Sequence, residues 1–394
     1  MSTQTYAIAY TNNLPAGSSL GSIQALVNSQ PEAYTVVCSA RTLINAVRRL
    51  KKETKLVPAL EAANVAFILE TPSMTAYSST GASANGNAPA NVYRNGVAAR
   101  RQQIMQELTF GFELEVEGPM TRYNVAQAIR RVVGGRIDNM GGTARSQGNQ
   151  YSVIARDGRT WKCMRDGSLA GDGGCEVVSP VCKAVDFPLI LKVVEAVKNA
   201  GATVSGRCGL HCHVGASHLT VDQLRNLVKV FNRFEELCFQ AIGTQPHRLD
   251  RWCRKNNPKF VSDLDEKRPR SKDEFGQLYY GADGARLEYE RTGHYSQSRY
   301  KALNLHNLFN GEKGTVEYRF GEATLDGEEV LAFVTLCLAM TAIGVEVEQT
   351  VSTKWTPENA KAFMRSALKY LGVTGETFGF AAARLLSRLP ESGI

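Results

Sequence analysis

The sequence lacks the features that mark secreted and membrane-bound chains. Residues 1–10, MSTQTYAIAY, have neither the basic start nor the apolar stretch of a signal peptide. No apolar run approaches the roughly 20 residues that a membrane-spanning helix needs. The nine cysteines are odd in number and lack the spacing of a disulfide framework. We therefore expect a cytoplasmic protein with free cysteines and no membrane partner.

Internal repeats and RNA- or DNA-binding motifs are absent as well. The net charge of +8 and the pI of about 9.0 favour an anionic partner, which could be nucleotide phosphates, an acidic substrate or nucleic acid. Because the basic residues are dispersed and no motif accompanies them, nucleic acid is the least favoured of the three. With 43% hydrophobic and 21% charged residues among 394, the chain can bury a large core.

Three regions follow from the distribution of apolar residues. Residues 1–70 resemble a small α/β unit of unknown role, with strands over 5–10, 33–39 and 64–70 and a helix over 41–53. Residues 71–101 are rich in Ser, Gly, Ala and Asn, which predicts a linker. Residues 102–394 hold the remaining strands and helices and are expected to form the main domain, with helices at its C-terminal end.

The third region mixes strands, a hairpin and long helices without regular alternation. Strands are expected over 110–118, 174–180, 209–215, 299–305 and 314–320, and a hairpin over 151–166 turns at Asp157-Gly158. Helices are expected after Thr121, over 187–201, over 221–242 and from Thr356 to Gly372, with a charged irregular segment up to about residue 298. This pattern predicts an α+β fold, in which helices back a curved, mainly antiparallel sheet.

Three of these strands carry charged side chains on one face. In FGFELEVEG, Glu113 and Glu115 point away from the apolar side, and taken alone this also fits an edge strand with a solvated acidic face. GLHCHVG places His211 and His213 on one face, and GTVEYRF places Glu317 and Arg319 on one face. The conjunction predicts one site on the polar face of the sheet.

Divalent cations would make such a site favourable. Carboxylates two residues apart on one strand face lie about 7 Å from each other, and their repulsion in a partly dry cleft is relieved by protons or cations. Oxygen-rich ligation with an imidazole suits Mg²⁺ or Mn²⁺ better than zinc.

At these motifs the chain resembles the amidoligase family, itself similar to glutamine synthetase and glutamate-cysteine ligase. The resemblance spans residues 108 to 340 and rests on FGFELE, DGS, GGCEVVSP, GLHCHVG, SRYKALNL and GTVEYRFGEATLD in that order. It implies a glutamine synthetase-like catalytic core that uses ATP to activate a small-molecule or peptide carboxylate as an acyl phosphate. An amine then displaces the phosphate to give an amide.

The resemblance also implies a role for individual residues. Two Mg²⁺ or Mn²⁺ ions would be held by metal ligands at Glu113, Glu115, Glu176, His211 and Glu317. Arg319 and Arg299 match arginines that hold the transferred phosphoryl group, as a forked guanidinium suits a phosphate-rich transition state.

Weaker candidates complete the set. His213 shares a face with His211 and could bind nucleotide or substrate, or orient a carboxylate. Asp166 and Ser168 in DGS match a family position near the substrate, which makes Asp166 the candidate general base, although an Asp-Gly turn also has a purely structural interpretation. Asn304 is ranked low, because strict alternation puts it on the face opposite Arg299.

Three other functions remain open at this stage. A metal-dependent hydrolase could use HxH as metal ligands, but the strand-helix alternation of a barrel is missing. A ligase scaffold without turnover could serve as a structural or binding protein in a larger assembly such as a phage particle, in which case the cytoplasm would be that of the host cell. A nucleic-acid binder is the fourth interpretation. The sequence leaves the oligomeric state open.

Overall fold

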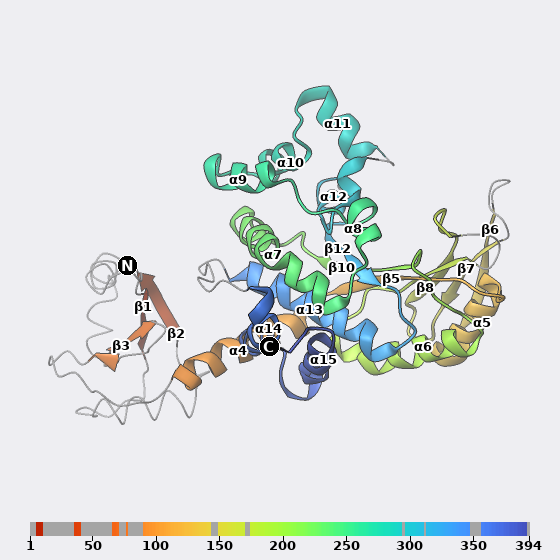
Figure 1. Cartoon of the computed structure of the whole chain (residues 1–394), viewed down its shortest axis with the longest axis horizontal. Coiled ribbons are helices and arrows are strands. Elements are labelled where there is room, and N and C mark those ends of the chain that lie inside the picture. Colours follow the sequence, from red (N-terminus) through yellow and green to blue (C-terminus); the bar gives the residue numbers. More distant parts are fainter. Residues whose placement is uncertain are drawn as a thin grey trace. The chain divides into compact units, whose positions relative to one another are not determined.

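The computed structural model describes residues 98–142, 149–169, 174–293, 296–310, 313–346 and 356–391, together with four strands and the start of a helix before residue 98. The chain divides into two compact units, Met1–Val97 and Ala98–Ile394. Figure 1 labels the elements of both units.

The first unit contains a four-stranded antiparallel sheet in the order β2-β1-β3-β4. Its strands are β1 (Thr5–Tyr10), β2 (Thr35–Ala40), β3 (Val65–Glu70) and β4 (Ala76–Tyr77). The three strands expected from the sequence are confirmed. The helix expected over 41–53 lies outside the described residues.

The end of the expected linker is helical. Helix α4 covers Ala90–Glu107, where the sequence predicted a linker up to residue 101. Met105 on this helix is fully buried, and the guanidinium of Arg101 lies 2.6 Å from the carboxylate of Glu346. The linker prediction rested on the composition of residues 71–101 taken together. Residues that favour a helix begin only after the Gly- and Asn-rich stretch, so they had little weight in that composition.

The second unit is built on an eight-stranded, wholly antiparallel sheet in the order β11-β12-β10-β5-β9-β8-β7-β6. The strands are β5 (Phe110–Val116), β6 (Arg136–Gly141), β7 (Gln150–Ile154), β8 (Thr160–Met164), β9 (Cys175–Val178), β10 (Gly209–Gly215), β11 (Leu303–Asn304) and β12 (Thr315–Glu322). The expected α+β fold is confirmed. Edge strand β6, RIDNMG, escaped prediction because it is largely exposed and has no alternating apolar residues.

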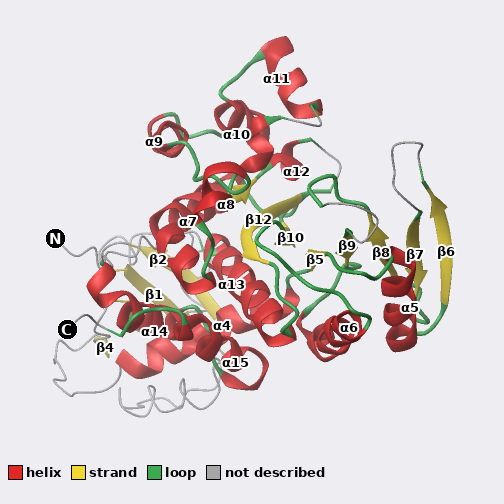
Figure 2. Ribbon diagram, turned by 45° about the vertical axis from the view of Figure 1, so that its right-hand side comes forward, coloured by secondary structure: helices red, strands yellow, loops and turns green. Residues whose placement is uncertain are grey.

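Helices cover one face of this sheet, and Figure 2 shows them gathered along it. They are α5 (Arg122–Val133), α6 (Phe187–Asn199), α7 (Val221–Ile242) and α13 (Gly327–Val345), followed by α14 (Ala360–Tyr370) and α15 (Gly375–Ser387). Capping residues set several of the helix ends, and Thr121 is the one expected from the sequence. Thr121 and Thr220 each form a capping box, and Gly243 ends α7 in the left-handed conformation.

Helix α13 corrects the expectation about apolar runs. By length and composition this 19-residue helix could span a membrane, but 83% of its apolar window is buried inside the protein. It packs against α7, α15 and β10, so its apolar residues serve the core. The cysteines in the described part of the chain are likewise free and buried.

The charged segment before residue 298 is helical rather than irregular. It forms α8 (Pro246–Arg251), α9 (Pro258–Glu266), α10 (Lys272–Tyr280) and α11 (Gly284–Thr292). The short helices η3 (Gln297–Tyr300) and α12 (His306–Phe309) follow it. The helices α9, α10 and α11 stand together beyond the β12 end of the sheet (Figure 1). Helices α8 and α9 begin at a proline, and α10 ends at a glycine. Because the helices are short, their apolar residues do not repeat often enough to show a helical period in the sequence.

Candidate active site

The central strands separate apolar and polar side chains onto opposite faces. Phe112, Leu114, Leu210, Cys212 and Tyr318 are fully buried on the helix-covered face. The other face of β5, β10 and β12 carries carboxylates, imidazoles and a guanidinium, as alternation along each strand requires. We call this second face the open face of the sheet.

Strand pairing brings the polar residues of different strands side by side. His211 lies opposite Glu113, His213 opposite Glu317, and Glu115 opposite Glu176. A β-bulge shifts the register between β10 and β12 beside His211. Bulges of this kind re-aim side chains near functional sites.

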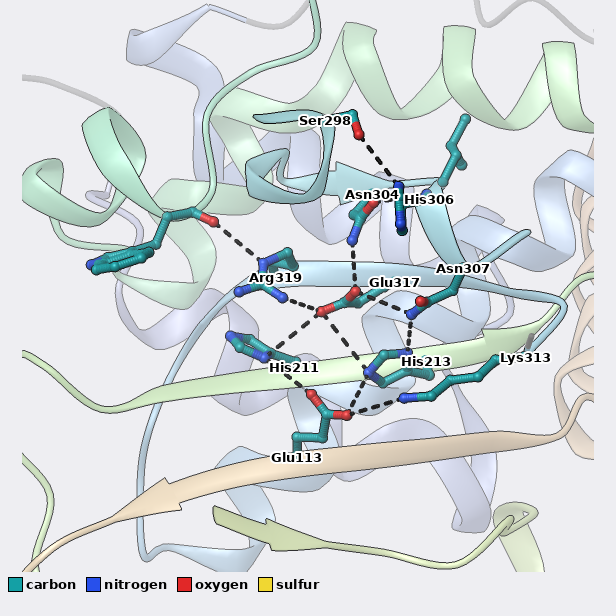
Figure 3. A network of polar contacts seen from close by, with 12 residues as sticks. Glu113, His211, His213, Ser298, Asn304, His306, Asn307, Lys313, Glu317 and Arg319 are labelled. Atoms are coloured by element: carbon teal, nitrogen blue, oxygen red, sulfur yellow. Dashed lines mark hydrogen bonds and ion pairs between the residues drawn. The ribbon is translucent and has the colours of Figure 1, made fainter. Parts of the chain in front are cut away.

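The first cluster of donors consists of Glu113, His211 and Glu317. Nδ1 of His211 lies 3.4 Å from Oε2 of Glu113 and 3.8 Å from Oε1 of Glu317. Nε2 of His213 lies 3.2 Å from Oε1 of Glu113 and 3.9 Å from Oε1 of Glu317. Figure 3 shows both imidazoles between the two carboxylates, with Lys313 reaching Glu113 from the side at 3.7 Å.

Glu317 is held by donors from three elements. Arg319 donates to its Oε1 from two residues along the same strand. Nδ2 of Asn304 donates to its Oε2 at 2.7 Å, and Nδ2 of Asn307 does so at 3.4 Å. Arg319 also donates from Nε to the carbonyl oxygen of Trp252 at 3.3 Å. Glu317 is therefore buried, and both of its carboxylate oxygens accept hydrogen bonds.

The second cluster consists of Glu115, Glu176 and the same His211. The backbone N–H of Gly209 donates to Oε2 of Glu115 at 2.6 Å. The guanidinium of Arg248 lies against Gly209, where an added Cβ would overlap it. A side chain at residue 209 would therefore displace the arginine.

The pKa directions differ between the two clusters. Burial by itself would raise the pKa of Glu113, but the charges of His213 and His211 bring it well below its usual range. Burial likewise opposes ionisation of Glu317, and Arg319 and His213 outweigh it, so the pKa of Glu317 is lowered. Burial disfavours the charged form of His213, yet Glu113 and Glu317 raise the pKa of that imidazole. These groups favour their ionised forms in the folded protein.

In the second cluster the carboxylates repel one another. Burial, together with the charges of Glu113, Asp166 and Glu115, raises the pKa of Glu176 well above its usual value. Burial also raises the pKa of Glu115. No protein cation at this position offsets the crowding fully, so the cluster favours a proton or a bound cation.

Both clusters fit a divalent cation by their donor chemistry. Within each, one ligand atom from every residue lies within 4.8 Å of the others. Carboxylate oxygens dominate, with one imidazole shared, and this set suits Mg²⁺ or Mn²⁺. Cations held by these donors would offset the negative charge of the carboxylates.

The structure brings together most of the residues that the sequence singled out. The five expected metal ligands Glu113, Glu115, Glu176, His211 and Glu317 occupy the two clusters, with His213 and Arg319 in contact with them. Asp166 is half-buried near Glu115 and Glu176, and it also accepts a hydrogen bond of 2.6 Å from the backbone of Ser168, as a turn residue does. Arg299 lies in η3, and no described contact joins it to the clusters.

Four residues of the site escaped sequence analysis or were ranked low. Asn304 faces Glu317 because only residues 303 and 304 are in a strand, so alternation from Arg299 does not apply. Asn307 and Lys313 come from α12 and the loop before β12. Arg248, which falls in the segment expected to be charged and irregular, is buried and pairs with Glu322 at 3.4 Å. The only signal for the two asparagines was their place in the ALNLHN motif.

Comparison with known proteins identifies the family. Residues 106–341, more than half of the chain, match the family described as "Putative amidoligase enzyme", and the chain belongs to this family of ligases. No curated protein matches the chain. A solved structure, a bifunctional glutathione synthetase from Pasteurella multocida, shares 12% identity over 74% of this chain and 49% of its own length, with a TM-score of 0.39. The chain thus spans about half of that protein.

Proposed function

We propose that the protein is an ATP-dependent carboxylate-amine ligase that acts through an acyl phosphate. The observation that carries this proposal is the pair of three-residue donor clusters that share His211, with the guanidinium of Arg319 at their edge. Phosphoryl transfer asks a protein mainly for positioned cations and guanidinium donors, which is what these clusters and Arg319 would supply.

The reaction would proceed in two displacements over the open face. An oxygen of the substrate carboxylate attacks the γ-phosphorus of ATP, and ADP leaves with the electrons of the broken bond. The amine nitrogen then attacks the acyl carbon, and phosphate leaves with the former carboxylate oxygen. Two divalent cations held by the clusters would neutralise the triphosphate and the acyl phosphate.

The chain's own residues would orient and compensate these charges. Arg319 is anchored by Glu317 and by the carbonyl oxygen of Trp252, so its remaining N–H groups would be available to the transferred phosphoryl group. His213 would sit beside the nucleotide, and Asp166 would take the proton from the attacking amine, since it lies beside Glu115 and Glu176. Arg299 remains a proposed second phosphate ligand on family resemblance alone.

The partners in this proposal are a small-molecule or peptide carboxylate and an amine, in the cytoplasm of a bacterium or of a phage's host. Hydroxylamine can stand in for the unknown amine, because it intercepts an acyl phosphate and leaves a hydroxamate. Incubation with ATP, Mg²⁺, hydroxylamine and pooled carboxylic acids and peptides should release ADP and phosphate and form hydroxamate. Chelation with EDTA should stop all three.

The variant Arg319→Lys tests whether the guanidinium group itself is needed. A lysine keeps the charge but cannot supply a planar fork, so we expect turnover to fall by about 10²-fold or more. Arg388→Lys is the matched control: Arg388 pairs with Glu329 on α13, on the helix-covered side of the sheet, so its variant should retain full activity. Release of neither ADP nor hydroxamate by a protein that still binds Mn²⁺ would contradict the ligase and favour a binding scaffold.

A further inference from the structure

The open face continues beyond the acidic clusters onto strands β9, β8, β7 and β6. Cross-strand partners point to the same face of an antiparallel sheet. The register joins Glu113 to Val178, Val178 to Lys162, Lys162 to Ser152 and Ser152 to Asp138. One row of side chains therefore runs from the first cluster to the far edge of the sheet.

The two faces of this half of the sheet differ in exposure. Val153, Trp161, Cys163 and Val177 are buried on the helix-covered face. On the open face, Val178 and Met164 are half-buried and Lys162 is exposed. No described helix covers these residues, so the face is accessible to a ligand.

Lys162 is a free cation on this face. None of the hydrogen bonds or ion pairs among the described residues involves its ammonium group. Asp138, the acid in the same row, is paired with Arg136 at 3.1 Å. Strand β8 lies two strands from β5, and neighbouring strands are about 4.8 Å apart. The backbone of Lys162 is therefore about 10 Å from the backbone of Glu113 in the hydrogen-bonding direction.

Apolar side chains fill the space between the acidic clusters and this lysine. Val178 lies between Glu113 and Lys162 in the row, and Met164 lies opposite Glu176 in the next row. The surface thus presents donors for divalent cations at one end, an apolar middle and one ammonium group at the other end. An acid with two carboxylates joined by an aliphatic segment matches this order.

We propose that the open face of β9 and β8 binds the acid substrate and selects one that carries a second carboxylate, which Lys162 holds while the first reacts. The aliphatic segment of the substrate lies over Val178 and Met164. This inference rests on the proposed function, because the reacting carboxylate is placed by the metal clusters. The substrate class is then a dicarboxylic acid, an acidic amino acid or a peptide with a free carboxylate in reach of Lys162.

The test compares matched acids in the hydroxamate assay with ATP and Mg²⁺. Glutarate, adipate, glutamate and a peptide with a free C-terminus are set against butyrate, pentanoate, 4-aminobutyrate and the same peptide with a C-terminal amide. We expect the acids with two carboxylates to be preferred by the wild-type protein. Lys162→Met should raise KM for them by about 10-fold to 100-fold, the value of a hydrogen bond to a charged group, and leave KM for ATP unchanged.

Two further variants separate charge from structure. Lys162→Arg should restore much of the preference, and Lys192→Met, which removes an exposed lysine from α6 on the covered side, should behave as wild type. Equal use of both kinds of acid, or a change in KM for ATP alone, would overturn the role of Lys162 and leave the ligase intact. Absence of hydroxamate and ADP with every acid would overturn the proposed function and this inference with it.

Discussion

The two donor clusters contain the same kinds of residue but differ in how the protein compensates them. In the first, Glu113 and Glu317 face His211, His213 and Arg319, and both carboxyl pKa values are lowered. In the second, Glu115 and Glu176 face each other and Asp166, and both pKa values are raised. Side chains neutralise the first cluster, whereas in the second the charges of His211, Arg248 and Lys313 do not outweigh burial and the repulsion between carboxylates.

This difference indicates which part of the site depends on a cation. A buried carboxylate with cationic partners is stable in its ionised form, whereas crowded carboxylates must take up protons or bind a metal. Occupation of the second cluster would therefore be coupled more strongly to folding stability than occupation of the first. Three changes would break or sharpen this contrast.

The largest expected effect is on turnover. Glu317→Gln and Glu176→Gln each remove one ligand charge from a different cluster, and each should lower the rate of ADP release by on the order of 10²-fold to 10³-fold. Glu107→Gln, an exposed change on α4, is the control and should have wild-type activity. Full activity in either cluster variant would remove that cluster from the site.

A smaller effect, of opposite sign in the two clusters, is expected on the stability of the metal-free protein. Because the pKa of Glu176 is raised, this carboxyl group contributes stability that is fully present below its ordinary pKa of 4.5. That contribution is lost as pH rises through the folded pKa. The lowered pKa of Glu317 means that its contribution is present above 4.5 and is lost as pH falls through the folded value.

At pH 8 with EDTA, Glu176→Gln should therefore raise the melting temperature. Glu317→Gln should lower the melting temperature, because the half-buried Arg319 loses its counter-charge. Each shift should be a few degrees, at about 2–4 °C per kcal/mol for a domain of this size. Calorimetry measures both variants, and shifts of the same sign would show that the clusters do not differ in this way.

The smallest effect concerns a buried carboxylate outside the site. Burial raises the pKa of Glu235 on α7 to about 7 although Lys255 and Lys301 lower it, and its Oε2 has no hydrogen-bond partner among the described residues. The free energy of unfolding should fall as pH rises from about 4.5 to about 7. Glu235→Gln should raise the melting temperature at pH 8 by a few degrees, leave it unchanged at pH 4 and leave turnover unaffected.

Mn²⁺ provides the comparison with Glu176. Because Glu235 lies outside both clusters, Mn²⁺ should stabilise Glu235→Gln as much as the wild-type protein. The same addition should stabilise Glu176→Gln less. Equal stabilisation of Glu176→Gln and wild type would place the cation elsewhere.

Much of the fold could be predicted where local patterns are strong. Alternation in FGFELEV and GLHCHVG, the turn at Asp157-Gly158 and the cap at Thr121 identified elements that the structure contains. Prediction failed where packing outweighs local pattern. Strand β6 exists by pairing with β7, and α8 to α11 are too short to show a period.

The candidate site, like the fold, was predictable where local patterns decide and unpredictable where tertiary packing decides. By itself the sequence determined which side chains leave the apolar face of each strand, because alternation is a property of the backbone within one strand. Only the tertiary structure decided that Glu115 meets Glu176, that Asn304 and Asn307 support Glu317, and that Lys162 shares a row with Glu113. Strand order and register join residues far apart in the chain, and they depend on the packing of the whole sheet rather than on any local pattern.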